Sequence, residues 1–145
     1  MVRRIAWLLA LAGAVPLALA TVALLSGETR VRIPAIAALV TYCAVILSFL
    51  GGIEWGLALR EGGVDERTRA AALFVSTAPS LAAWGVLWLP SATWQLAASL
   101  ALFVLVWLAD LGMSRRGLIP SWFVDVRTAI TALVAVILGV ALFLL

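Results

Sequence analysis

Three ionisable side chains, Glu54, Asp110 and Arg127, stand inside long apolar stretches of this sequence. A charge at membrane depth costs at least ~2.5–3.5 kcal/mol, so such residues usually face the interior of a helix bundle and pair with one another. Arg127 is expected to bridge either Asp110 or Glu54. Desolvation then favours the protonated form of the acid that is left over. Thr131, one helical turn beyond Arg127, lies on the same face and is expected to join the network.

These four residues, Glu54, Asp110, Arg127 and Thr131, are called the charge cluster below. Counting inward from the nearest loops at 1.5 Å per residue, each ionisable group is expected to lie roughly 7–9 Å in from the same face of the membrane. Two interpretations stay open. The cluster is either a buried ion pair that fixes how the helices pack, or a site that binds a proton or a polar ligand, as intramembrane ionisable residues often do.

A second pattern consists of small residues at four-residue spacing, Ser48, Gly52 and Gly56. Small residues allow two helices in a membrane to approach closely. The pattern predicts helix packing within the chain, with contact to a second protein as the alternative. Glu54 lies about 200° around the helix from Gly52, so it is expected to face elsewhere, on a helix with neighbours on both sides.

A third pattern combines hydroxyl groups with a proline, in Ser76, Pro79, Ser80 and Trp84. Pro79 leaves the carbonyl of Val75 without its usual helical donor, and nearby hydroxyls help to satisfy such a kink. The pattern predicts a kinked helix with Ser76, Ser80 and Trp84 on one face, lining a small cavity. Ordinary helix packing is the alternative.

Five apolar segments must position these residues. A helix that crosses the ~30 Å hydrocarbon layer needs about 20 apolar residues. The first segment is expected to be a permanent helix, because its apolar run is longer than that of a signal peptide. The sequence predicts an all-α, single-domain integral membrane bundle of five transmembrane helices. They are expected at residues 5–25, 34–59, 69–89, 93–112 and 123–145.

The composition excludes a soluble globule: 66% of the residues are hydrophobic and 12% are charged, with a mean hydropathy of +1.20. Soluble domains are about one-quarter charged. The chain has no histidine and one cysteine, Cys43, so we expect no metal site and no cofactor. Nothing resembles a phosphate-binding loop or a nucleophile–base pair. The chain is therefore not expected to be an enzyme.

The arginines set the expected orientation, because cytoplasmic loops carry an excess of basic residues. All ten basic residues are arginine, and with five crossings eight of them fall on one side. The amino terminus is therefore expected to be cytoplasmic and the carboxyl terminus external. We attribute the basic balance to topology and expect no nucleic-acid partner. The larger group is Arg3, Arg4, Arg60, Arg67, Arg69, Arg115, Arg116 and Arg127, and the smaller group is Arg30 and Arg32.

Several stretches, which cover every segment but the first, together resemble a known family. The most specific is Ser48-Phe49-Leu50-Gly51-Gly52 followed by Trp55-Gly56. The others are Ser76 to Ser80, Trp84, Leu89-Pro90, Asp110, Pro120, Trp122-Phe123, Arg127 and Thr131.

In these residues the chain is similar to the domain-of-unknown-function 3429 family, which includes the transmembrane protein 69 group of mitochondria. In the family pattern a histidine commonly stands between the glycines and the tryptophan, where this chain has Glu54. That departure argues against a role that needs imidazole, while a titratable group is kept. The resemblance implies a small multi-pass protein of energy-transducing membranes, here the bacterial cytoplasmic (inner) membrane, and implies no reaction.

Three functions are expected, in this order. The first is a structural or accessory subunit, or assembly partner, of a larger membrane complex such as one of the respiratory or photosynthetic chain. Its partners are other membrane-protein subunits and membrane lipids. The second is a small proton-linked transporter that uses Glu54, with Arg127 and Asp110 as gate or counter-ion. The third is a lipid- or quinone-binding module, with a cavity near Pro79 and Trp84 and the charge cluster at its mouth.

Overall fold

A computed structural model describes residues 1–60 and 64–145, and it confirms the predicted all-α class. Within those residues there are five α-helices and a single 3₁₀ turn, η1. Four helices, α1 with η1, α2, α4 and α5, are long and apolar enough to cross a membrane. The elements are α1 (Val2–Ala23), η1 (Leu24–Ser26), α2 (Thr29–Leu59), α3 (Glu66–Val86), α4 (Ala92–Arg115) and α5 (Ser121–Leu144).

Helix α3 is less apolar than the other four. Its 21 residues would extend about 31 Å at 1.5 Å per residue. However, Glu66, Arg67 and Arg69 occupy its first turn, and three hydroxyl residues follow in its second half. Length alone therefore allows α3 to span a membrane, while its composition is the least hydrophobic of the five.

Each predicted segment forms a helix, and the largest difference is at the start of α2. That helix begins at Thr29, before the predicted start at Pro34, so the proline lies inside the helix. The side chain of Arg32 stabilises this early turn. Its Nη1 donates to the carbonyl of Leu24 at 3.0 Å and its Nη2 to the carbonyl of Leu144 at 2.9 Å. Both acceptors are carbonyls at the ends of neighbouring helical segments.

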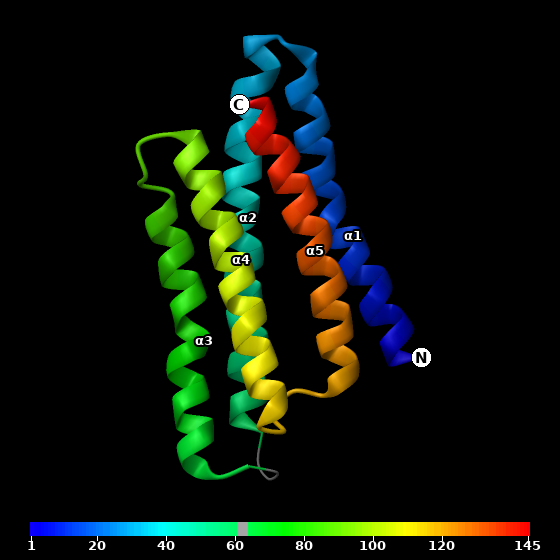
Figure 1. Cartoon of the computed structure of the whole chain (residues 1–145), viewed down its shortest axis with the longest axis vertical. Helices are drawn as coiled ribbons and strands as arrows, with labels where there is room; N and C mark the ends of the chain where they lie inside the picture. Colours follow the sequence, from blue (N-terminus) through cyan, green and yellow to red (C-terminus); the bar gives the residue numbers. More distant parts are fainter. Residues whose placement is uncertain (61–63) are drawn as a thin grey trace.

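Helix α2 is the central element of the bundle and contacts α1, α3 and α4, whereas α5 contacts α1 and α4. Among the described residues α2 and α5 make no direct backbone contact, and α1 and α4 hold them apart. Figure 1 shows the amino terminus, the start of α3 and the α4–α5 connection at one end of the bundle. The carboxyl terminus and the α1–α2 and α3–α4 connections lie at the other end (Figure 1).

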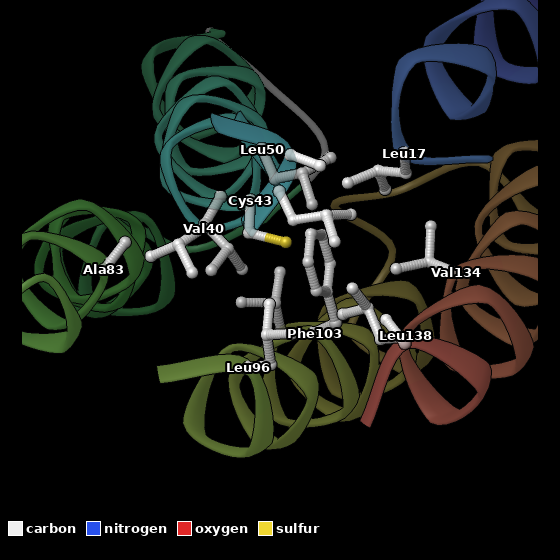
Figure 2. Packing of buried hydrophobic residues seen from close by; sticks show 14 of the residues in the cluster. Leu17, Val40, Cys43, Leu50, Ala83, Leu96, Phe103, Val134 and Leu138 are labelled. Atoms are coloured by element: carbon white, nitrogen blue, oxygen red, sulfur yellow. The ribbon is translucent and has the colours of Figure 1, made fainter. Parts of the chain in front are cut away.

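Buried apolar side chains fill the space between these helices. Figure 2 shows Leu17 of α1, Cys43 of α2, Leu96 and Phe103 of α4 and Leu138 of α5 converging on one core. Phe103 is 1% exposed and stands in the middle of this group, between α2 and α5 (Figure 2). A large side chain from α4 thus bridges the gap that the two backbones leave open.

The close contact of α2 with α3 is made by Gly51. A Cβ atom at this position would overlap the backbone carbonyl oxygen of Ser76, so any side chain would force the two helices apart. The predicted packing residues Ser48, Gly52 and Gly56 are instead exposed, and nothing lies within 4 Å of a Cβ built on either of these glycines. The prediction that this stripe packs within the chain is wrong. One residue of offset turns a side chain by about 100°, which separates Gly52 from Gly51.

Helix α3 begins with a side-chain cap. Asp65 Oδ2 accepts a hydrogen bond from the backbone N–H of Thr68 at 3.1 Å, and Asp65 Oδ1 accepts one from the Thr68 hydroxyl at 2.7 Å. These bonds favour the ionised carboxylate, and the pKa of Asp65 lies below its usual value. A carboxylate here also interacts favourably with the positive end of the helix dipole.

Candidate functional site

The centre of the charge cluster is an ion pair between α4 and α5. Arg127 Nε donates to Asp110 Oδ2 at 2.6 Å, and the two side chains are 7% and 2% exposed. Of the two partners that the sequence allowed for Arg127, the structure selects Asp110. A charge-assisted hydrogen bond at this burial is among the strong polar contacts of proteins, and here it joins two helices that are neighbours in sequence.

Glu54 brings a second acid to the cluster from α2. It is 2% exposed, and neither of its carboxylate oxygens has a hydrogen-bond partner among the described residues. Asp110 and Arg127 are the charged groups that act on it electrostatically. As predicted, Glu54 is buried and faces a different side of α2 from Gly52, although Gly52 is exposed. The cluster therefore holds one guanidinium and two acids, and only one of the acids is hydrogen-bonded to it.

Thr131 is buried next to Arg127, but it does not join the hydrogen-bond network as predicted. Its hydroxyl oxygen has no partner in the described part of the chain, and the same holds for Arg127 Nη2. Buried polar groups are bonded in the great majority of cases. Two unpaired groups one helical turn apart on α5 are therefore unusual, as are the two unpaired oxygens of Glu54 in the described part of the chain.

A hydrogen bond that the sequence analysis did not predict lies beside the cluster. Trp107 Nε1 donates to Thr128 Oγ1 at 2.9 Å, so α4 and α5 are joined a second time, on the exposed side. Trp107 precedes Asp110 by three residues and Thr128 follows Arg127 directly. This spacing, together with the pairing of Asp110 with Arg127, is the signal that could have revealed the bond.

The polar residues of α3 do not form the predicted cavity wall. Ser76 and Pro79 face the interior, whereas Trp84 is 62% exposed and stacks edge-on against Trp88. The Ser76 hydroxyl donates to the carbonyl of Leu73 at 2.8 Å. Residues eight apart differ by about 80° around a helix. Trp84 therefore points away from the face that Ser76 occupies, although the two residues fit a four-residue spacing. The alternative of ordinary helix packing fits Ser76 and Pro79.

A cavity is present on another side of the bundle, between α1, α2 and α5. Its volume is about 470 Å³. Small residues of α1 form one wall, and Arg127 and Thr131 stand among the residues of α5 that line it. This cavity was not predicted from the sequence. The signal for it was a face of small residues in the first segment, Ala6, Ala10, Gly13 and Ala14.

Tyr42 fixes α1 against α2 at the edge of this cavity. Its hydroxyl donates to the carbonyl of Gly13 at 3.0 Å. The bond satisfies a polar group that would otherwise face an apolar surface. Among the described residues that line the cavity, Thr131 and Arg127 are then the ones with an unpaired buried side-chain atom, Oγ1 and Nη2 respectively.

The described residues do not bring three histidine, cysteine, aspartate or glutamate side chains together in a group that could hold a metal ion. No curated protein and no solved structure matches the chain. The sequence pattern of a family described as "protein of unknown function (DUF3429)" matches residues 2–143, which confirms the resemblance found in the sequence.

Proposed function

We propose a role for this chain, which belongs to the DUF3429 family of proteins of unknown function, as a non-enzymatic accessory subunit or assembly partner of a larger membrane complex. One observation carries the proposal. The central helix α2 presents Ser48, Gly52 and Gly56 on the outside of the bundle, with nothing within 4 Å of a Cβ at either glycine. Such a stripe allows a second transmembrane helix to approach the backbone closely.

The neighbours of this stripe support a helix as its partner. Val45 and Phe49 are 57% and 66% exposed on the adjacent part of α2. Small residues flanked by large apolar side chains suit the close van der Waals packing on which helix association in lipid depends. The loops between the described helices are too short to form an extramembrane domain, so contacts with a partner would be made within the membrane.

The proposed topology has five crossings of the cytoplasmic membrane of a bacterium. It counts α3 as a membrane span in addition to α1, α2, α4 and α5. Eight of the ten arginines then belong to the end of the bundle that holds the amino terminus (Figure 1). That end is cytoplasmic by the excess of basic residues. The carboxyl terminus would be external. Reporter fusions to each connection and to both termini test this topology.

Site-specific photocrosslinking in intact cells tests the role as an accessory subunit. A benzophenone amino acid at Ser48 is expected to form an adduct with a different membrane protein, identified by mass spectrometry. The same probe at Val136, which is 65% exposed on α5, serves as the position control. Gly52→Leu should abolish the adduct and Gly139→Leu should preserve it, since Gly139 is also an exposed helical glycine with open space around it. Absence of any adduct at Ser48, or an adduct with a second copy alone, would contradict the proposal.

A small proton-linked transporter is the second candidate function. The buried carboxylate of Glu54, which has no hydrogen-bond partner among residues 1–60 and 64–145, favours it. An intramembrane acid without a hydrogen-bond partner is a typical proton-binding group of such proteins. Proteoliposomes that carry a pH-sensitive dye would report proton flux. Glu54→Gln should abolish that flux, while Glu66→Gln at the exposed start of α3 should not. Equal flux in both variants would exclude this function.

A further inference from the structure

The cavity between α1, α2 and α5 follows from the arrangement of the helices. The backbones of α2 and α5 make no direct contact among the described residues, and the α1 face that covers the gap carries small side chains such as Ala10 and Gly13. Phe103 fills part of the gap, and about 470 Å³ stays open. Sites for small molecules are typically concave, mostly apolar and about 300–1,000 Å³ in volume.

The cavity has an apolar opening on the outer surface of the bundle. Leu9 of α1 and Val45 and Phe49 of α2 line the cavity and are also 57–67% exposed. Figure 1 shows α1 and α2 joined at one end and diverging toward the amino terminus. A molecule that enters between these two helices therefore comes from the acyl-chain region around the bundle.

Two residues in the inner wall of the cavity carry polar atoms without partners. Arg127 and Thr131 are each 6% exposed, both line the cavity, and Arg127 Nη2 and Thr131 Oγ1 are buried and make no hydrogen bond among the described residues. A buried donor that is left unpaired is unfavourable. Two residues with such donors, one turn apart in the wall of one apolar cavity, indicate an acceptor oxygen supplied by a ligand.

The charges near these donors determine which oxygen fits. Asp110 already neutralises Arg127, and the buried carboxyl of Glu54 acts on the same guanidinium. A phosphate or carboxylate head would add an anion beside two acids, which is unfavourable at this burial. A neutral carbonyl oxygen accepts the same hydrogen bonds without that repulsion. The rings of Phe49, Phe103 and Phe123 line the cavity as well and suit a planar head group.

We propose that this cavity binds an isoprenoid quinone, with a ring carbonyl held by Arg127 Nη2 and the Thr131 hydroxyl and the chain leaving between α1 and α2. The proposal concerns binding only and does not depend on the accessory role of the α2 stripe. Thr131 is a positioning and specificity residue in this site. Its hydroxyl supports no other contact in the described part of the protein.

The test is a titration of the full chain in detergent micelles with decylubiquinone, followed by native mass spectrometry and by the unfolding temperature. Binding should saturate and raise the unfolding temperature. Thr131→Val keeps the side-chain shape and should weaken binding about tenfold, the loss expected for one hydrogen bond. The unfolding temperature of this variant without ligand should not fall, because the hydroxyl has no partner to lose.

Two matched controls make the test specific. Thr21 is also buried with an unpaired hydroxyl but does not line the cavity, so Thr21→Val should bind like the parent chain. Ala10→Phe should fill the cavity and abolish binding, whereas Ala12→Phe on the exposed side of α1 should not. The proposal is overturned if decylubiquinone does not saturate the parent chain, if the two threonine variants bind equally, or if phosphatidylglycerol displaces the quinone.

Discussion

Arg127 and Asp110 form a buried ion pair, 2.6 Å from Nε to Oδ2, between two helices whose connection is only a few residues long. The pair lies beside Glu54 from α2, so three helices contribute charge to one interior region. Its stability depends on each partner being present, because a single charge left at this burial has no compensation.

Removal of one partner of this pair should destabilise the protein strongly. Asp110→Ala leaves the guanidinium of Arg127 with Glu54 as its remaining acid and should lower the free energy of unfolding by about 3–5 kcal/mol. Unfolding of the purified chain in mixed micelles, followed by circular dichroism, measures this loss. The double variant Asp110→Leu with Arg127→Leu should recover most of it, since the buried guanidinium is then no longer left without its carboxylate. If both variants were equally unstable, the pairing would not be the cause.

The close contact between α2 and α3 should be sensitive to a single methyl group. Gly51→Ala places a Cβ against the carbonyl of Ser76 and should destabilise the bundle by about 1–3 kcal/mol, as overpacking does. The adjacent Gly52→Ala meets open space and is the control, with no loss expected. The midpoints of unfolding of the two variants give the comparison. Equal midpoints would show that α3 adjusts to the added side chain.

Arg32 should stabilise the helix ends next to the carboxyl terminus. Its hydrogen bonds to the carbonyls of Leu24 and Leu144 tie α2 to η1 and to the last turn of α5. Arg32→Ala should increase amide hydrogen exchange in residues 140–145, where fraying normally begins. Arg30→Ala removes an exposed arginine two residues away and should leave the exchange unchanged. Protection that is the same in both variants would refute a role for the Arg32 contacts.

The cap of α3 should make stability depend on acid. The pKa of Asp65 is lower in the folded protein than its usual value, so the folded state favours the carboxylate. The contribution of the cap is complete above the unfolded pKa of about 3.9 and is lost as the pH falls through the lower folded value. Asp65→Ala should therefore destabilise the protein at neutral pH and flatten the decline of stability in acid. Glu66→Gln, one residue further on, is the control, and an unchanged acid decline in Asp65→Ala would contradict the assignment.

The approximate positions of the helices and the burial of the three charged residues together were predictable from the sequence. Apolar runs fix the segments, and depth from the nearest loop brings Glu54, Asp110 and Arg127 to one level, but depth alone does not choose between the two acids as the partner of Arg127. The packing face of α2 was not predictable in the same way. Gly51 and Gly52 are neighbours in sequence, and a four-residue pattern through Gly52 looks like a contact although the contact is made by Gly51.

The cavity between α1, α2 and α5 could not be predicted from single segments, because it depends on how far apart the helices lie. Trp84 and Ser76 belong to one helix, so the sequence suggested a site there, but the turn of the helix places Trp84 outside. The actual space exists because the backbones of α2 and α5 make no direct contact among the described residues, and because α1 carries small side chains where it covers them. Such a gap is a property of three helices together, and local patterns indicate only the small residues of α1.

The order of the charged residues along the chain has a consequence for biosynthesis. When α4 has emerged from the ribosome, Glu54 and Asp110 are outside it and Arg127, which follows in α5, is not. Two acids thus leave the ribosome ahead of their counter-charge. Until α5 inserts, these helices depend on water or on the insertion machinery to solvate the acids. The cavity between α1 and α2 also lacks the residues of α5 that complete its wall. Assembly of the bundle is therefore completed only when α5 arrives.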